Sequence, residues 1–141
     1  MATARALGCT AAVTDAGAVD APRGWDVVID CTGSAAAIAD GIGRVGKGGT
    51  YLQFGVAGYD TRVTIEPYRV YNQEITIIGS MAVLHSFDRA GELFVAGFLD
   101  PDVFISHRHP LDRYADALAE FRAGAGRKHQ SVAPGRGWPT G

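Results

Sequence analysis

The stretch WDVVIDC, Trp25–Cys31, decides how the rest of the chain is interpreted. It contains consecutive β-branched residues with little alternation between apolar and polar positions, as does ITIIG, Ile75–Gly79. Near-continuous apolar runs of this kind are typical of strands that are buried on both faces of a parallel sheet. Two further runs, YLQFGV (Tyr51–Val56) and the weaker TAAVT (Thr10–Thr14), bring the number of expected strands to four.

Helical patterns lie between and after these strands. Ser34 and Ser86 are suitable N-caps for two helices, and Gly124 stands where a third helix should end. The apolar positions of the three helices recur at helical spacing: Ile38, Ile42 and Val45; Phe87, Ala90, Phe94 and Phe98; Leu111, Tyr114, Leu118 and Phe121. Strands that alternate with helices indicate βαβ units, and therefore an α/β fold with a parallel sheet.

Composition narrows the possible functions. The chain has 141 residues, of which 47% are hydrophobic and 20% charged, so we expect it to fold as one domain or as part of a larger one. A net charge of −2 argues against a nucleic-acid partner, and the sequence lacks the ~20-residue apolar run of a membrane span. Its two cysteines, Cys9 and Cys31, fit a reducing compartment. The start is faintly similar to a signal peptide, but its apolar stretch, Ala6–Val13, is short and is soon followed by Asp15. We therefore expect a cytoplasmic location.

The glycine-rich stretch GIGRVGKGGT, Gly41–Thr50, fits the dinucleotide-binding pattern G-x-G-x-x-G and most of the P-loop pattern G-x-x-x-x-G-K. A phosphate loop follows a strand and opens a helix, so that the helix N-terminus faces the phosphate. Here the order is reversed, because the glycines close a helix and lead into the strand YLQFGV. We interpret the stretch as a glycine C-cap and turn.

Both ends of the chain are unusual for such a fold. Residues 2–7 resemble the last turns of a helix closed by Gly8, although a βαβ domain would begin with a strand. We expect that the beginning of the domain is missing. Residues 131–141 are rich in glycine and proline, and we expect a loose tail there.

Four stretches carry a resemblance to a known family: GWDVVIDCTGSAAAI, GRVGKGGTYLQFGVAG, EITIIGSMAV and ISHRHPLDRYADALAEFRAGAGRKHQ. Together with ARALGCTAAVTD they resemble the C-terminal part of the zinc-dependent medium-chain alcohol dehydrogenases, especially the sorbitol and threonine dehydrogenase-like branch. The similarity runs from about Thr3 to Gln130. It implies a partial nucleotide-binding domain over residues 1–130, an incomplete Rossmann-type sheet corresponding to strands three to six.

The resemblance implies an oxidoreductase that uses NAD or NADP on an alcohol or polyol. In the family, a separate N-terminal catalytic domain supplies Cys, His and Glu ligands to a zinc ion. That domain, the glycine-rich turn and the first two Rossmann strands would all precede Met1. We therefore expect the chain alone to be inactive and poorly stable, with Thr10–Thr14 lacking a neighbouring strand.

The resemblance also implies part of a cofactor site. Cys31, Thr32 and Gly33 correspond to positions near the nicotinamide-side ribose, and Arg127 or Lys128 to a cation near the pyrophosphate. Positions whose backbone groups bind the carboxamide correspond to Phe54, Gly55, Val56, Ser80 and Ala82. The alternative is that Gly33, Gly55 and Gly79 only turn the strand ends.

In the family, the sixth strand often pairs with its copy in another subunit. The corresponding segment, Ile75–Ala82, contains neither proline nor lysine to protect an edge, which fits self-pairing. We expect a homo-oligomer formed through this segment. The alternative function is a non-catalytic interaction module that pairs with itself or with a full-length dehydrogenase.

The remaining titratable residues suggest no catalytic group. His107 and His109 would point the same way from a strand, which permits a metal pair, but no third ligand is near in sequence. We therefore expect a surface strand without a metal, and we regard His85 and His129 as isolated, with His129 exposed.

Asp30 and Cys31 follow each other at the end of the first strong strand. We expect Asp30 to pair with a neighbouring helix terminus rather than to act as a general base. Cys31 is expected to be a small buried residue rather than a reactive thiol.

Overall fold

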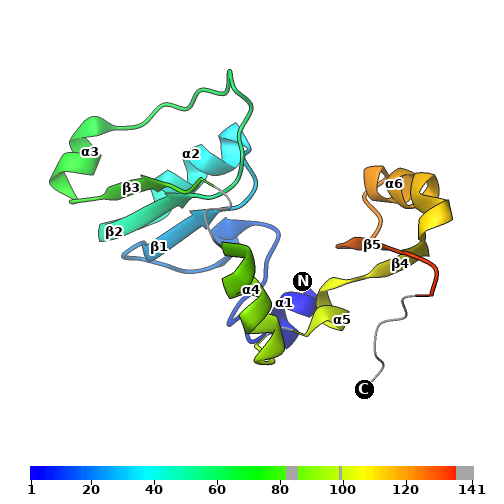
Figure 1. Ribbon diagram of the computed structural model, residues 1–141. Helices are drawn as coiled ribbons and strands as arrows, with labels where there is room; N and C mark the ends of the chain where they lie inside the picture. The colour runs from blue at the N-terminus through cyan, green and yellow to red at the C-terminus, as the bar shows by residue number, and fades with distance from the viewer. Residues whose placement is uncertain (82–85, 99, 136–141) are drawn as a thin grey trace. The chain divides into compact units, whose positions relative to one another are not determined.

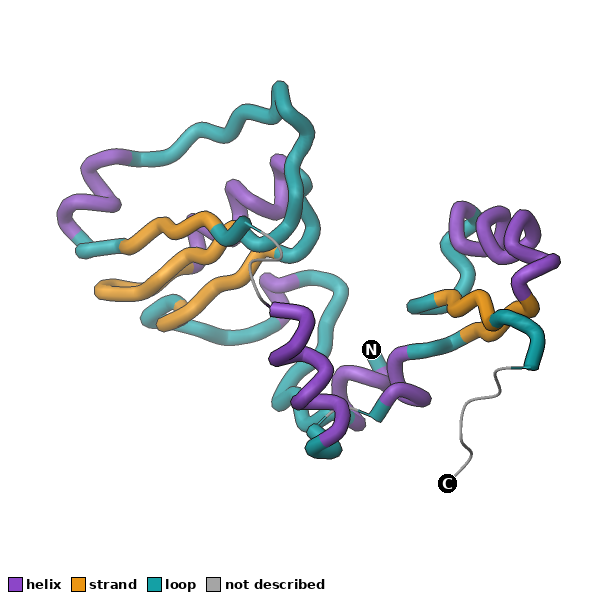
Figure 2. Tube along the Cα trace, viewed as in Figure 1, coloured by secondary structure: helices purple, strands orange, loops and turns teal. Residues whose placement is uncertain are grey.

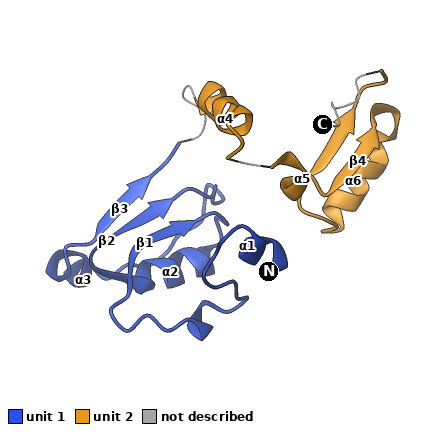
Figure 3. Cartoon of the chain, turned by 90° about the horizontal axis from the view of Figure 1, so that it is seen from below, with its two compact units in different colours: residues 1–84 blue, residues 85–141 orange. Residues whose placement is uncertain are grey.

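The computed structural model describes residues 1–81, 86–98 and 100–135. The chain forms two compact units, Met1–Leu84 and His85–Gly141 (Figure 3). The partial nucleotide-binding domain expected over residues 1–130 stays a prediction, and this range includes residues of both units. No helix in the described part of the chain has the length and apolar character needed to cross a lipid bilayer.

A parallel sheet forms the centre of the first unit (Figures 1 and 2). Its strands are β1 (Trp25–Asp30), β2 (Val45–Gln53) and β3 (Thr76–Gly79), in the order β1-β2-β3. The register pairs Val28 with Tyr51, and Tyr51 with Ile77. A parallel Rossmann-type sheet is thus confirmed, and its order agrees with consecutive strands at one end of such a sheet.

The helices of this unit are α1 (Ala2–Ala6), α2 (Ala35–Arg44) and α3 (Pro67–Asn72), with a 3₁₀ turn at Ala16–Ala18. The expected strand Thr10–Thr14 is wrong, because these residues have irregular backbone. A strand needs a neighbour for its N–H and C=O groups. In the described residues β1 pairs with β2, and no strand lies beyond it.

One face of the sheet carries the core, where α2 packs on β1 and β2 (Figure 1). The buried cluster consists of Ile38, Ile42, Val45, Tyr51 and Ile75. On the opposite face the side chains of Val27, Ile29 and Ile78 are 60%, 54% and 47% exposed. The prediction of strands buried on both faces is therefore wrong for β1 and β3.

The glycine-rich stretch is divided between a helix and a strand. Helix α2 ends at Arg44 and β2 begins at Val45, so Val45 is not a helical residue and the strand starts six residues before the predicted Tyr51. The predicted glycine C-cap is also wrong, since Val45 occupies that position. A Cβ on Gly46 would lie 2.5 Å from the carbonyl oxygen of Arg23, and one on Gly49 would lie 2.8 Å from that of Trp25. These glycines allow β2 to approach the backbone at the start of β1.

The second unit contains a two-stranded parallel sheet. Its elements are α4 (Ser86–Val95), α5 (Pro101–Phe104), β4 (His107–Pro110), a 3₁₀ turn at Leu111–Arg113, α6 (Tyr114–Arg122) and β5 (His129–Val132). Ser86 is the first residue of α4 rather than a residue before it. Ser131 and Val132, at the start of the expected tail, pair with His109 and Pro110.

Candidate functional site

Two loops meet where β1 and β2 end. Asp30 is paired with Gln53, so the segments Cys31–Gly33 and Phe54–Val56 leave the sheet side by side. Ser80 follows β3 at the same edge, and its N–H donates to the carbonyl oxygen of Gln53. In open α/β sheets, ligands bind outside the carboxyl ends of the strands. The predicted nicotinamide-side residues therefore do gather at the edge where a ligand is expected.

The two loops are packed backbone against backbone. Gly33 has φ of +69°, and a Cβ there would lie 2.1 Å from the carbonyl oxygen of Val56. A Cβ on Gly55 would lie 2.6 Å from the amide nitrogens of Thr32 and Gly33. Both positions require glycine for this close backbone contact.

The Asp30 carboxylate links the two loops through hydrogen bonds. This residue is only 6% exposed. Its carboxylate accepts hydrogen bonds from the Thr32 hydroxyl (2.7 Å), from the amides of Thr32 (3.2 Å) and Gly33 (2.9 Å), and from Gln53 Nε2 (2.8 Å). Burial by itself raises the pKa of the Asp30 carboxyl, but these hydrogen bonds outweigh it and hold the pKa below its ordinary value. A carboxylate that is charged and fully engaged in this way positions the loops and is not a general base.

Tyr51 and Gln53 extend this network into the core. The Tyr51 hydroxyl donates to Gln53 Oε1 at 2.9 Å, and Gln53 Nε2 also donates to the carbonyl oxygen of Gly55 at 2.7 Å. Burial and the nearby charge of Asp30 raise the pKa of the Tyr51 hydroxyl. Sequence reasoning missed both residues, although a glutamine inside the apolar run YLQFGV was a usable signal.

The other predicted residues of this edge are open to solvent. Cys31 and Thr32 are exposed, as is Ser80, and the side chains of Phe54 and Val56 are 57% and 91% exposed. The expectation that Cys31 is buried is therefore wrong. The residue predicted beside Ser80, Ala82, lies outside the described residues.

The groups at these strand ends suit the nicotinamide half of a dinucleotide. Exposed apolar side chains of Phe54 and Val56 can contact a flat ring, and the backbone of the glycine turns can approach a ribose or carboxamide closely. Asp30 is a charged group at the point where these two loops meet, and its carboxylate oxygens are occupied by hydrogen bonds.

Arg127 and Lys128 belong to the second unit. The Arg127 guanidinium donates to the carbonyl oxygen of Val103, and the backbone amides of both residues donate to the Ser106 hydroxyl. These contacts tie the segment before β5 to the segment before β4.

A hollow of about 870 Å³ lies at the opposite edge of the first unit, where β1 begins. It is lined in part by Arg23, Lys47 and Arg69. The Arg69 guanidinium is already bound to backbone carbonyls at the end of α2. This hollow is therefore a weaker candidate for a nucleotide site than the carboxyl ends of the strands.

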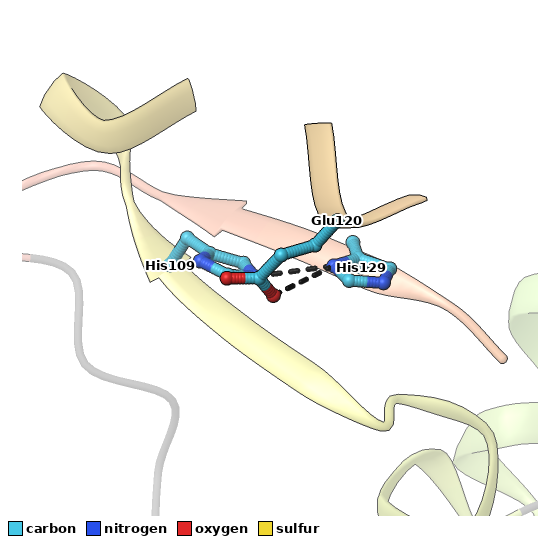
Figure 4. A group of neighbouring side chains, drawn as sticks. All are labelled: His109, Glu120 and His129. Carbon is cyan, nitrogen blue, oxygen red and sulfur yellow. Dashed lines mark hydrogen bonds and ion pairs between the residues drawn. The ribbon is translucent and has the colours of Figure 1, made fainter. Parts of the chain in front are cut away.

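A second constellation lies in the second unit, where His109, Glu120 and His129 converge (Figure 4). The prediction that His129 is isolated and exposed is wrong, because its side chain is 7% exposed and lies 3.1 Å from His109. The expected pair of His107 and His109 is not the group that forms. His109 lies instead with Glu120 and His129, which come from distant parts of the sequence.

The parallel sheet, its helix-covered face and its strand-end glycines define a Rossmann-type nucleotide-binding fold. Residues 1–96 match the family described as zinc-binding dehydrogenase, which is more than half of the chain. The chain therefore belongs to the zinc-dependent medium-chain alcohol dehydrogenase family.

Known relatives agree with this assignment. D-arabinitol dehydrogenase 1 of Uromyces fabae is 37% identical over 99 residues, covering 70% of this chain and 28% of that protein. D-altritol 5-dehydrogenase of Agrobacterium fabrum is 30% identical over 112 residues, covering 79% and 33%. A structure described as a zinc-binding dehydrogenase from Sinorhizobium meliloti 1021, bound to NADP, superposes with a TM-score of 0.68 at 29% identity, covering 79% and 32%. The chain thus spans about a third or less of the length of these proteins.

Proposed function

We propose that these residues form the cofactor-binding part of a zinc-dependent dehydrogenase that oxidises an alcohol or polyol with NAD or NADP. Family membership supports this proposal, and so do two relatives named for their action on arabinitol and altritol. A structural neighbour that was solved with NADP supports the choice of cofactor class.

The observation that carries the proposal is the junction of the two glycine turns. In our proposal the backbone of Cys31–Gly33 binds the nicotinamide-side ribose, and the backbone of Phe54–Val56, with Ser80, binds the carboxamide. Asp30 fixes both turns in place before the ligand arrives, which lowers the ordering cost of binding. When bound, the nicotinamide accepts the hydride released by the alcohol carbon. Ala82, Arg127 and Lys128 stay as predictions from the resemblance.

In the proposed complete enzyme, a zinc ion would polarise the alcohol oxygen and favour loss of its proton, which is the other half of the chemistry. Among the described residues, the group of three potential metal ligands lies in the second unit and not at the strand ends. We therefore expect these residues alone to bind a dinucleotide without oxidising polyols. Formation of NADH or NADPH from sorbitol or arabinitol by the purified chain would contradict this division of labour.

The direct test is a titration of the ¹⁵N-labelled chain with NAD⁺ and NADP⁺, followed by NMR. We expect shifted amide signals at residues 31–33 and 54–56. The affinity should be about 1 mM, because the proposed contacts come from the backbone of two short turns. Phe54→Ala should weaken binding, whereas Phe87→Ala, which changes an exposed phenylalanine of the second unit, should not. Shifts confined to other residues, or none at millimolar cofactor, would refute the proposed site.

A second candidate function is an interaction module that pairs through β3, with another copy of the chain or with a full-length dehydrogenase. The observation that favours it is the outer position of β3 in the sheet, with all four of its residues exposed. Edge strands without proline or charge readily pair with other strands.

Sedimentation of the purified chain at increasing concentration tests this pairing. Ile78 pairs with Leu52, on the face opposite to buried Tyr51, so Ile78→Lys adds a charge without entering the core. We expect this substitution to shift a dimer towards monomer, whereas Val95→Lys, at a 91% exposed site in α4, should not. A wild-type chain that stays monomeric at all concentrations would exclude self-pairing.

A further inference from the structure

Three potential metal ligands from separate elements of the second unit converge on one point (Figure 4). His109 Nε2 lies 3.1 Å from His129 Nδ1 and 3.5 Å from Glu120 Oε2. His129 Nδ1 lies 4.0 Å from the same carboxylate oxygen. His109 is in β4, Glu120 in α6 and His129 in β5, so only the folded chain brings them together.

The strand register explains why the two imidazoles meet. His107 is paired with His129 and His109 with Ser131, so His109 and His129 are diagonal neighbours on two parallel strands. The ring of His107 stacks on that of His129 with centroids 4.5 Å apart and planes 5° apart. Helix α6 contacts both strands, and it carries Glu120 to the pair. These contacts fix the ring planes without a bound ligand.

Burial and hydrogen bonding prepare the His129 ring for a ligand. Its side chain is 7% exposed, and that of His109 is 14% exposed. His129 Nε2 lies 2.7 Å from the carbonyl oxygen of Ala125, an acceptor, so Nε2 carries the proton. The other nitrogen, Nδ1, then directs its lone pair at His109 and Glu120. A histidine that donates one ring N–H to a backbone carbonyl while the other nitrogen is free is the usual arrangement of a metal ligand.

We propose that His109, Glu120 and His129 bind a divalent transition metal ion, for which Zn²⁺ is the best match. Two imidazoles and one carboxylate form a known zinc donor set, with a water molecule in the fourth position. Bond lengths of 2.0–2.1 Å place tetrahedral ligand atoms roughly 3.3–3.4 Å apart. The separations involving His109 are near this value, and only that between Glu120 and His129 must shorten. Glu120 can make this adjustment because its side chain is 46% exposed.

The site does not depend on the proposed cofactor binding. All three residues lie in the second unit, whereas the proposed cofactor contacts at residues 31–33, 54–56 and 80 lie in the first. Magnesium and calcium are poor candidates, since both prefer oxygen ligands over imidazole. Without a metal, the same geometry would be a histidine pair with one N–H···N hydrogen bond beside a carboxylate. A direct measurement of metal uptake separates these two states.

The experiment is a titration of the metal-free full chain with Co²⁺ and Zn²⁺, in a Cys9→Ser/Cys31→Ser background that removes the two exposed thiols. We expect one ion per chain, with the visible absorption of tetrahedral Co²⁺ and its displacement by Zn²⁺. Glu120→Gln should weaken binding by at least about 10–100-fold, the loss seen even for outer partners of metal ligands. His129→Ala should abolish the Co²⁺ spectrum.

Two matched controls define the site. Asp116→Asn removes an exposed carboxylate of the helix that carries Glu120, one that pairs with Arg113, and Glu92→Gln removes a carboxylate on α4. Neither substitution should change the metal affinity by more than about threefold. Circular dichroism of each variant will show whether the fold is kept.

If His129→Ala fails to fold, Glu120→Gln still decides the question, because its exposed side chain is not part of the buried core. Lack of micromolar uptake by the parent chain would overturn the proposal. So would equal uptake by Glu120→Gln, or loss of binding in Asp116→Asn.

Discussion

Two glycines of the first unit, Gly33 and Gly43, differ in the space around them. Replacing each by alanine should therefore change the free energy of unfolding in opposite directions. Gly33 has a positive φ, and a Cβ there would lie 2.1 Å from a carbonyl oxygen. Gly43 lies in α2, and a Cβ there would meet no atom within 4 Å outside the helix's own backbone. Gly33→Ala should lower the free energy of unfolding by about 1–3 kcal/mol through overpacking alone. Gly43→Ala should raise it by about 0.5–1 kcal/mol, because alanine is the better helix former. Urea unfolding followed by circular dichroism measures both, and changes of equal sign would contradict the assigned contacts.

The carboxylate of Asp30 should make the stability of the first unit depend on pH. Its native pKa is below the ordinary value of 3.8, so its contribution is complete above that pH. As the pH falls from 3.8 through the lower native pKa, the folded state must also take up a proton, and this contribution is lost. Asp30→Asn should therefore cost about 1–3 kcal/mol at pH 7, since an amide cannot accept all these hydrogen bonds.

The difference between Asp30→Asn and the parent chain should shrink in urea titrations below pH 3.8. Asp26→Asn, which changes an exposed acid on the same strand, is the matched control and should have little effect at either pH. A stability difference independent of pH would mean that Asp30 acts by shape rather than by charge.

At the scale of elements, the end of α2 depends on one side chain from α3. The Arg69 guanidinium donates to three carbonyl oxygens, at 2.9, 3.2 and 2.6 Å: those of Ile42, Gly43 and Val45. Helix ends leave such carbonyls without intrahelical partners, and a cation also complements the helix dipole there. Arg69→Ala should lower the free energy of unfolding by about 1–3 kcal/mol. Arg69→Lys should recover only part, because one ammonium cannot reach three acceptors in a fixed fork.

Arg62→Ala provides the comparison, since its guanidinium binds only carbonyls of the same loop, those of Tyr59 and Thr61. We expect a change of less than about 0.5 kcal/mol for this surface position. If chemical denaturation gave equal losses of unfolding free energy for Arg62→Ala and Arg69→Ala, the end of α2 would not depend on the Arg69 hydrogen bonds.

Local sequence patterns predicted several of the strands and helices correctly. The strands β1 and β3 and the helices α2 and α6 follow directly from apolar runs and helical spacing. The start of β2 was missed because a glycine looks the same in a turn as where two backbones approach closely, as Gly46 does with Arg23. The His109–His129 contact was missed because it joins residues 20 positions apart, and no spacing rule reports such a pairing. The residues of the two strand-end turns were named from the family resemblance, whereas the packing of these turns against each other was not predicted.

At the scale of the whole molecule, the two units have very different cores. Among the described residues, the buried hydrophobic side chains of the first unit are Ile38, Ile42, Val45, Tyr51 and Ile75, whereas the second unit contributes only Ala117. Hydrophobic burial is the main favourable term in folding, so the second unit should open at lower free energy than the first. In the first unit, the exposed apolar face of the sheet should favour association.

We therefore expect the isolated chain to be poorly stable and to unfold without one sharp transition. Hydrogen exchange followed by mass spectrometry should show faster exchange in β4 and β5 than in β1 and β2. Zn²⁺ should slow exchange in β4, β5 and α6, which supply its three proposed ligands, because a ligand stabilises the state to which it binds. Calorimetry and sedimentation complete the measurement. A single sharp thermal transition of a monodisperse monomer would contradict the expectation, since it would mean that the two units stabilise each other and that the open sheet face needs no partner.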